Sequence, residues 1–215
     1  MKTYEPKNIR NVALLGHQGS GKTSLLESIA FIAGLVKKKG TVEEGNTISD
    51  YLKEEKNHKI SYKNSLVPVE YQDYKYNFID TAGIRRSSKI NDKIEKYSVL
   101  RSHMAVDRAD VAVIVIDAQV GFTEQDSKVA GIAHEMGKAC IIAVNKWDAY
   151  EKDGKTMDVY RKKLMNDFSF MSYAPIIFIS AKTGQRAEKL FALADEVLEH
   201  SRYRITTGTL NDFIS

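Results

Sequence analysis

Six short apolar runs recur along the chain and predict the strands of a single sheet. The last four contain near-continuous β-branched stretches, which is typical of strands covered on both faces. The second run alternates apolar and polar positions and contains Pro68, which favours the edge of a sheet. The runs are NVALLG from Asn11, NSLVPVEYQ from Asn64, YKYNFID from Tyr74, DVAVIVID from Asp110, ACIIAVN from Ala139 and APIIFIS from Ala174.

Apolar positions at helical spacing lie between several of these runs. Alternating strands and helices predict an α/β fold, with a mostly parallel six-stranded sheet and helices on both faces. A hairpin through Gln72 and Asp73 is the expected exception. Since we find neither a repeat nor a flexible linker, we expect a single domain over residues 1–215. The helical positions are Leu25, Ile29 and Ile32, then Val129, Ile132, Ala133 and Met136, then Leu190, Leu193, Val197 and Leu198.

Composition describes an ordinary globular chain. Of its 215 residues, 43% are hydrophobic and 28% are charged, and the net charge of +4 is too mild to indicate a nucleic-acid partner by itself. Cys140, the one cysteine, lies in an apolar run and is expected to be a buried reduced thiol. We expect a cytoplasmic protein, because we find no apolar leader and no run approaches the roughly 20 residues that span a bilayer.

The stretch GHQGSGKTS matches the phosphate-loop pattern G-x-x-x-x-G-K-[ST] between a predicted strand and a helix. Glycines there let backbone amides and the helix N-terminus approach phosphate oxygens, whereas a plain glycine-rich turn is the alternative. Lys22 would bridge the β- and γ-phosphates as a catalytic residue, and the Thr23 hydroxyl would ligate Mg²⁺. The expected phosphate-binding residues are Gln18, Gly19, Ser20, Gly21, Lys22, Thr23 and Ser24.

Asp80 ends the third run, beside the expected phosphate loop. A carboxylate at that edge can hold Mg²⁺ through a water molecule. Gly83, in the following DTAG, can offer its amide to the γ-phosphate and is the second catalytic candidate.

Two further motifs predict which base is bound. Asp148 of NKWD can accept hydrogen bonds from guanine N1 and N2, a donor pair that adenine lacks. A backbone amide of SAK can bind guanine O6. All four motifs occur in order at predicted carboxyl ends of strands, where doubly wound sheets bind ligands, so the pattern predicts a guanine nucleotide. The expected guanine-binding residues are Asn145, Lys146, Asp148, Ser180, Ala181 and Lys182.

These motifs resemble those of the translation-factor-like P-loop GTPases, which implies a three-layer P-loop domain that hydrolyses GTP. Residues 1–82 resemble elongation factor G in NIRNVALLGHQGSGKTSLLESI, GTVEEGNTISDYLKEE and KISYKNSLVPVEYQDYKYNFIDT. Residues 83–215 resemble the second GTPase domain of Der (EngA), a bacterial ribosome-assembly factor, in GIRRSSKINDKIEKYSVLRS, VIDAQVGFTEQD, VNKWD, YAPIIFISAKTGQR and TGTLNDFIS. These two resemblances indicate a chimera joined at DTAG, and a natural mosaic, an engineered chimera and a sequence-assembly error would each give this pattern.

The resemblance also bears on hydrolysis. By likeness to elongation factor G, residues 37–63 form the first switch, and Ser61 stands where that family has its magnesium-binding threonine. Elongation factor G has a histidine where this chain has Ile84, and Der holds K⁺ with an asparagine where this chain has Gly19. We therefore expect slow hydrolysis that relies on Lys22, Mg²⁺ and backbone amides, with K⁺ as a further candidate cofactor. His17 is expected to pack or face solvent rather than act as a general base.

The segment from Ile84 to Arg101 carries six basic and two acidic side chains, so its charge of +4 equals that of the whole chain. It would contact RNA phosphates or form a solvated helix face. Both resembled families work at the ribosome, which favours ribosomal RNA, and we expect a monomer. Three readings stay open: a GTP-hydrolysing switch at the ribosome, a nucleotide-binding module with little hydrolysis, and a non-functional hybrid.

Overall fold

The computed structural model describes residues 2–49, 64–81, 92–151, 153–205 and 207–214, with the backbone alone at 92–98 and 209–210. Gly83, proposed for catalysis, and Ser61, proposed as a metal ligand, lie outside these residues, as does Ile84, which stands where elongation factor G has a histidine.

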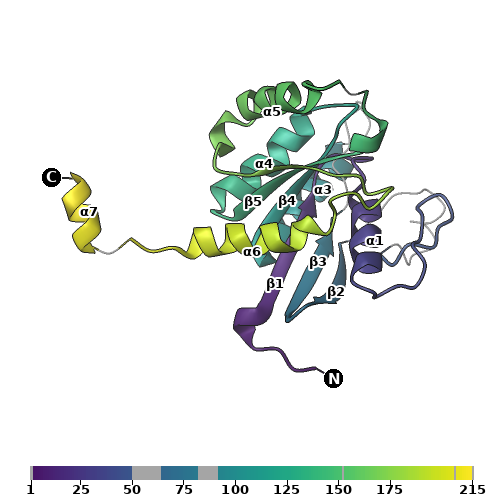
Figure 1. Ribbon diagram of the computed structural model, residues 1–215, viewed down its shortest axis with the longest axis horizontal. Coiled ribbons are helices and arrows are strands. Elements are labelled where there is room, and N and C mark those ends of the chain that lie inside the picture. The colour runs from purple at the N-terminus through teal and green to yellow at the C-terminus, as the bar shows by residue number, and fades with distance from the viewer. Residues whose placement is uncertain (1, 50–63, 82–91, 152, 206, 215) are drawn as a thin grey trace.

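All six predicted strands occur and form one sheet in the order β2-β3-β1-β4-β5-β6 (Figure 1). Only β2 is antiparallel to its neighbour, so the predicted mostly parallel sheet is confirmed. The carboxyl ends of the five parallel strands therefore meet at one edge. The strands are β1 (Ile9–Leu15), β2 (Ser65–Tyr71), β3 (Tyr74–Asp80), β4 (Val111–Asp117), β5 (Ala139–Asn145) and β6 (Ile176–Phe178).

The hydrophobic pattern of each strand matches its place in the sheet. Every residue of β4 and β5 is buried, as the continuous apolar runs predict for central strands. On β2, buried positions alternate with the exposed Leu66, Pro68 and Glu70, which suits an edge strand. The predicted hairpin is also present: Tyr71 pairs with Tyr74, and Gln72 between them has φ +54°.

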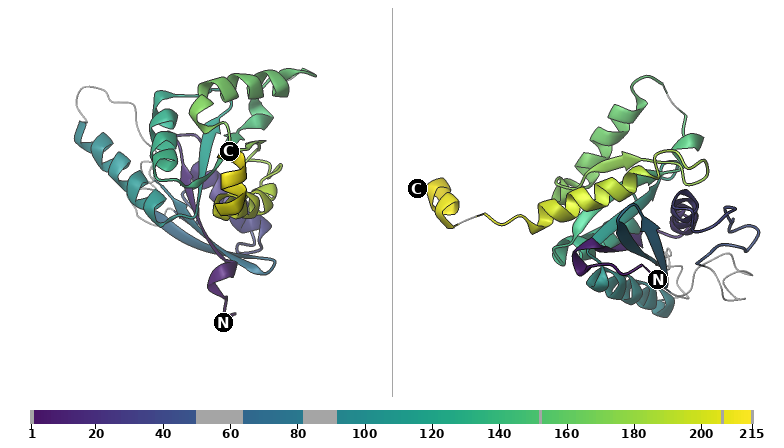
Figure 2. Two further views of the ribbon diagram at one scale, coloured as in Figure 1. Left: turned by 90° about the vertical axis from the view of Figure 1, so that its left-hand side faces the viewer. Right: turned by 60° about the horizontal axis from the view of Figure 1, so that its bottom comes forward.

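Helices cover both faces of the sheet, as predicted (Figures 1 and 2). One apolar cluster joins α1 and α6 to the sheet face that carries Val12, Leu14 and Val113. The other cluster joins α3, α4 and α5 to the opposite face. The helices are α1 (Lys22–Ile32), α3 (Asp92–Arg108), α4 (Glu124–Glu135), α5 (Thr156–Asp167), α6 (Lys189–Arg202) and α7 (Thr207–Ile214), with 3₁₀ turns η1 (Pro6–Asn8), η2 (Trp147–Ala149) and η3 (Ser169–Met171).

Three features differ from the apolar pattern. Strand β6 has only three residues, although the run that predicts it extends from Ala174 to Ser180. Helix α5 was not expected, because only Tyr160 and Leu164 are buried along it. Helix α7 lies apart from the sheet in Figure 1, with Phe213 91% exposed.

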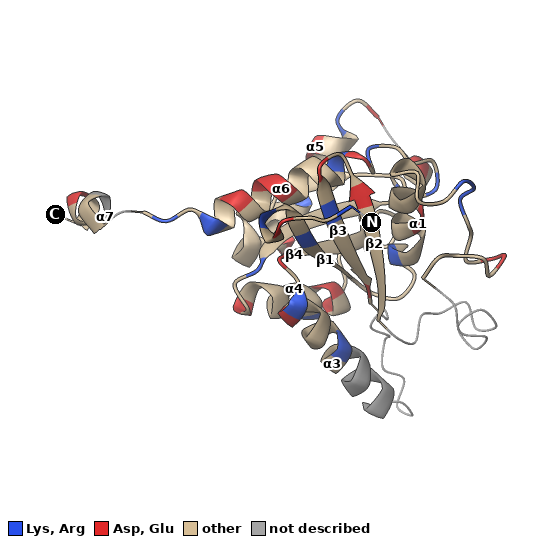
Figure 3. Ribbon diagram, turned by 90° about the horizontal axis from the view of Figure 1, so that it is seen from below, with Lys and Arg blue, Asp and Glu red and all other residues tan. Residues whose placement is uncertain are grey.

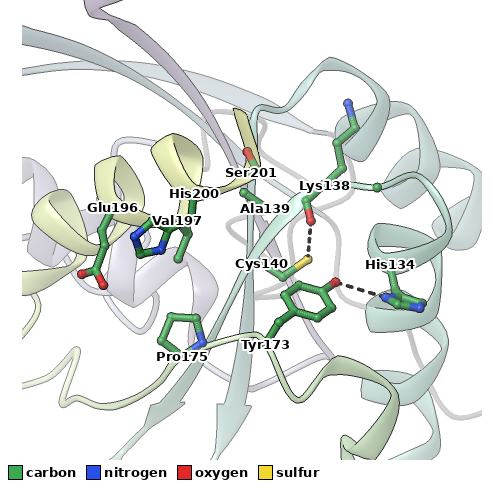
Figure 4. A pocket seen from close by; sticks show the side chains of 11 residues that line it. His134, Lys138, Ala139, Cys140, Tyr173, Pro175, Glu196, Val197, His200 and Ser201 are labelled. Atoms are coloured by element: carbon green, nitrogen blue, oxygen red, sulfur yellow. Dashed lines mark hydrogen bonds between the residues drawn. The ribbon is translucent and has the colours of Figure 1, made fainter. Parts of the chain in front are cut away.

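Cys140 is buried, as predicted, at the amino end of β5. A pocket of about 610 Å³ opens beside it, between α4, α6 and the segment before β6 (Figure 4). The Tyr173 hydroxyl lies 3.1 Å from His134 Nδ1 in this pocket. Burial raises the pKa of the Cys140 thiol to about 11, which keeps it neutral at physiological pH.

None of the described helices is both long enough and apolar enough to cross a bilayer.

Candidate nucleotide-binding site

The predicted phosphate loop connects β1 to α1 at the carboxyl edge of the sheet. Gly16 and Gly21 have φ of +140° and +90°, in the region that glycine favours. A Cβ atom at Gly16 would lie 2.3 Å from the Val115 carbonyl oxygen, and one at Gly21 would lie 2.3 Å from Asn145 Nδ2. The loop backbone therefore packs closely enough against β4 and β5 that only glycine fits at these two positions.

Asn145, the first residue of NKWD, ties the two halves of the site together. Its Nδ2 donates a hydrogen bond of 2.9 Å to the Ser20 carbonyl oxygen in the phosphate loop. Its Oδ1 accepts one of 2.9 Å from the Ala181 amide in SAK. The expected guanine-binding residue Asn145 is thus placed to hold the phosphate and guanine loops in register.

Lys22, the lysine of the phosphate loop, is 95% buried at the start of α1. Its ammonium donates to the carbonyl oxygens of Gly16 at 3.1 Å and His17 at 2.9 Å. Burial lowers the pKa of Lys22 to about 8, although Asp80 and Asp126 oppose that shift. The lysine is therefore poised over the loop as a cation for phosphate oxygens.

His17 packs rather than facing solvent. Its Nδ1 lies 3.1 Å from both carboxylate oxygens of Asp126, and its backbone amide donates to Asp126 Oδ1 at 3.0 Å. Asp126 is fully buried and also closes a capping box with Thr123 at the start of α4. No sequence motif indicates Asp126, which anchors the phosphate loop to α4.

Oxygen donors for a divalent cation gather beside the loop. Thr23 Oγ1 donates to Asp80 Oδ2 at 2.8 Å, so two predicted metal ligands lie together. The Ser49 hydroxyl donates to the same Asp80 oxygen at 3.0 Å, a contact that the motifs do not indicate. A hydroxyl and a carboxylate at the mouth of a phosphate loop are hard oxygen ligands, which fit Mg²⁺. A Mg²⁺ ion held there would neutralise the negative charge of the bound phosphates.

The NKWD segment follows β5 and forms η2. Lys146 has φ +60°, and its ammonium pairs with Asp117 Oδ2 at 2.6 Å at the end of β4. Asp117 was missed as a site residue, although an acid at the end of a buried strand was the available signal. Asp148 is exposed, so its carboxylate is accessible to a base.

In the SAK segment, Ser180 is fully buried and its hydroxyl accepts a hydrogen bond of 3.1 Å from the Thr183 amide. The Ala181 amide already donates to Asn145, so the structure does not offer it freely to guanine O6. Lys182 is exposed beside it. At the tip of the phosphate loop Gln18 and Gly19 are exposed, while Ser24 is half-buried on α1.

The sheet order, the phosphate loop and the converging NKWD and SAK segments define the class as a P-loop GTPase fold. Residues 7–200 match the elongation factor Tu GTP binding domain, and the chain belongs to that family.

Similar proteins bear the name GTPase Der. The one from Ruminiclostridium cellulolyticum is 46% identical over 211 residues, 98% of this chain and 44% of the relative. The one from Acetivibrio thermocellus is 56% identical over 147 residues, 68% of this chain and 33% of the relative. This chain thus spans less than half the length of these two curated relatives.

A solved structure of Era, in complex with MgGDPNP and nucleotides 1506–1542 of 16S ribosomal RNA, is similar in fold. It gives a TM-score of 0.66 at 19% identity, over 93% of this chain and 59% of that chain.

Proposed function

We propose that the chain binds guanine nucleotides and hydrolyses GTP to GDP and phosphate. The observation that carries this proposal is the double hydrogen bond of Asn145, which joins the phosphate loop to the guanine loop. Membership in a GTP-binding family and the relatives named GTPase Der support it.

Phosphate binding would rest on the buried Lys22 and on loop amides, with Mg²⁺ held by Thr23 and Asp80. His17 contacts Asp126 and is not free to act as a base. Two further contributions are proposed from residues outside the described ranges: the Gly83 amide on the γ-phosphate and the Ser61 hydroxyl on Mg²⁺. Ile84, also outside these ranges, supplies no histidine for hydrolysis. Hydrolysis would then be slow, because positioning and electrostatics act without a histidine.

A single-turnover assay of phosphate release in K⁺ and in Na⁺ tests this mechanism. We expect slow hydrolysis that K⁺, the further candidate cofactor, does not stimulate relative to Na⁺, because Gly19 has no side-chain oxygen to hold the ion. Fast, strongly K⁺-stimulated turnover would contradict the proposal.

A gain-of-function variant sharpens the test. A Cβ atom at Gly19 would meet no atom of the described residues within 4 Å, and asparagine tolerates the φ of +86° better than most other non-glycine residues do. Gly19→Asn should therefore gain K⁺ stimulation of about tenfold or more, whereas the control Gly19→Ala should not.

A nucleotide-binding module with little hydrolysis is the second candidate function. Gly19 and Ile84 favour it, since both catalytic groups of the resembled families are replaced. Tight GDP binding without phosphate release would establish this alternative.

We infer that ribosomal RNA is the macromolecular partner, which would place the chain in the cytoplasm, and we propose separately that the chain is a monomer. The basic segment 84–101 and the Der relatives support this, and the RNA in the Era complex is a precedent within the fold. Arg85→Ala with Arg86→Ala should weaken binding to a 16S fragment and reduce its salt dependence. The matched pair Lys162→Ala with Lys163→Ala, exposed on α5, should do neither.

We further propose one domain over residues 1–215 that joins an elongation-factor-G-like half, 1–82, to a Der-like half. The motifs that resemble each family on either side of DTAG support this division, while a GTPase Der matches 98% of the chain at 46% identity. The halves meet where β1 pairs with β4. Replacing residues 1–82 by the Der equivalent should raise the melting temperature if this junction packs imperfectly; no change would favour undivided ancestry.

A further inference from the structure

A lysine outside the phosphate-loop, DTAG, NKWD and SAK motifs, in the segment expected to form the first switch, contacts the guanine loop. Lys39 lies in the segment after α1, and its ammonium donates to the carbonyl oxygens of Ala181 and Lys182, the latter at 2.9 Å. These two residues are the end of SAK. The contact spans more than 140 residues of sequence, so the motifs alone do not reveal it.

The planarity of the peptide group links this contact to base recognition. The Ala181 carbonyl and the Lys182 amide belong to one trans peptide, in which C=O and N–H point in opposite directions. By holding the Ala181 carbonyl, the Lys39 ammonium fixes the direction of the Lys182 N–H.

Other amides of the loop are already used. The Ala181 amide donates to Asn145 Oδ1 and the Thr183 amide to Ser180 Oγ. The Gly184 amide donates to the Ser180 carbonyl oxygen. Within the described residues, the Lys182 amide alone of these four has no hydrogen-bond partner, so it is the one available for guanine O6.

The position of Lys39 is itself fixed by Glu27, a buried carboxylate on α1. Glu27 accepts hydrogen bonds from the backbone amides of Gly40 at 2.8 Å and Ile48 at 2.9 Å, and so clamps both ends of the segment that follows Lys39. Burial lowers the pKa of Lys39, while the charge of Glu27 opposes that shift. The ammonium therefore reaches the guanine loop from an anchored backbone.

We propose that Lys39 is a positioning residue for guanine recognition, which orients the Lys182 amide toward O6 of the base. This inference rests on the proposed binding of guanine nucleotides. It concerns residues 39, 181 and 182, and it assigns no role in the phosphate chemistry to Lys39.

The test compares three ligands that differ at the base. GDP and inosine diphosphate both carry O6, whereas 2-aminopurine riboside diphosphate lacks it. Lys39→Met removes the ammonium and should weaken the binding of GDP and of inosine diphosphate by about tenfold each. The same substitution should weaken the binding of 2-aminopurine riboside diphosphate by less than about twofold. Equilibrium titration with each diphosphate measures these ratios.

Lys38→Met is the matched control, because Lys38 is exposed one residue away, and it should bind all three ligands as the parent does. Lys39→Arg, which restores charged donors, should recover part of the loss. Equal GDP affinity in Lys39→Met and Lys38→Met would overturn the inference, as would an equal loss on all three ligands. Failure of the parent chain to bind any guanine nucleotide would instead refute the proposed function.

Discussion

At the scale of single residues, the Lys22 ammonium is buried, and burial disfavours its charged form. Since its pKa is lowered to about 8 from the ordinary 10.5, the folded chain binds fewer protons than the unfolded chain between these values. The contribution of Lys22 to the free energy of unfolding therefore rises with pH over that window. Bound phosphates would favour the charged form and reverse the shift.

GDP affinity should accordingly depend on pH through Lys22. It should be constant below pH 8 and fall by up to about tenfold per unit above it, because the free lysine must regain its proton to bind phosphate. Titrations from pH 7 to 9 measure this. Lys22→Arg, whose guanidinium stays charged, should lack the decline below the ionisation of guanine itself. A parent profile as flat as that of Lys22→Arg would contradict the assignment.

Asp148 should decide which base is bound. Asp148→Asn should lower GDP affinity about a hundredfold, because the carboxylate no longer accepts from guanine N1 and N2. The same variant should prefer xanthosine diphosphate, whose C2 oxygen can accept from the new amide. Competition titrations measure both effects, and Asp158→Asn, exposed on α5, should leave GDP binding unchanged. Undiminished GDP affinity in Asp148→Asn would exclude this role.

The residues that sequence reasoning found are those with a fixed spacing along the chain, such as Lys22 and Thr23. It missed Asp117, Asp126 and Ser49, which act on motif residues from distant parts of the chain. An isolated acid or serine has no local signature, because its role depends on which strand or helix the fold brings beside it.

At the scale of elements, one buried carboxylate joins the phosphate loop to helix α4. Asp126 accepts from the amide and hydroxyl of Thr123 at 3.1 and 2.7 Å, and from the His17 amide at 3.0 Å. Capping and loop geometry therefore depend on the same side chain.

Asp126→Asn should destabilise the fold by about 2 kcal/mol, because an amide placed against buried donors leaves them unsatisfied. It should also weaken GDP binding, since the loop loses its anchor. Urea unfolding and GDP titration measure the two effects. The control Glu124→Gln alters only an exposed ion pair on the same turn and should cost less than about 0.5 kcal/mol. If Asp126→Asn behaves like this control, the anchoring role is wrong.

Elements that bury many residues were predictable, and those that bury few were not. The fully buried β4 and β5 follow from their apolar runs, whereas α5 buries only Tyr160 and Leu164 and leaves little periodic signal. For β6, the run is longer than the strand because Ile179 and Ser180 are buried after pairing ends. The pattern of apolar residues along the chain therefore indicates which residues are buried, and it indicates the ends of helices and strands less well.

At the scale of the whole molecule, acidic and basic residues are interspersed over the described elements (Figure 3). The chain is held by two apolar clusters on opposite faces of the sheet. Residues from before and after position 82 enter each cluster, such as Leu25 with Phe191 in one and Leu15 with Ile114 in the other. The N-terminal and C-terminal parts of the chain therefore share their cores, which the order of motifs alone did not establish.

Truncations at the C-terminus should show that α6 is needed for folding and that α7 is not. Deleting residues 205–215 should change the melting temperature by less than about 2 °C and leave GDP affinity unchanged, because Phe213 and Ile214 are 91% and 76% exposed. Deleting from residue 189 should prevent folding, since α6 buries Leu190, Phe191, Ala194 and Leu198. Thermal unfolding followed by circular dichroism measures both. Strong destabilisation by the shorter deletion would show that α7 belongs to the core.

We propose that the phosphate loop and the distant NKWD and SAK segments form one site for one guanine nucleotide. Equilibrium titration with fluorescent GDP, competed by GTP and by ATP, measures whether they do. We expect saturable binding of GDP that GTP displaces and ATP does not. Displacement by ATP as effective as by GTP, or no binding of GDP, would contradict it.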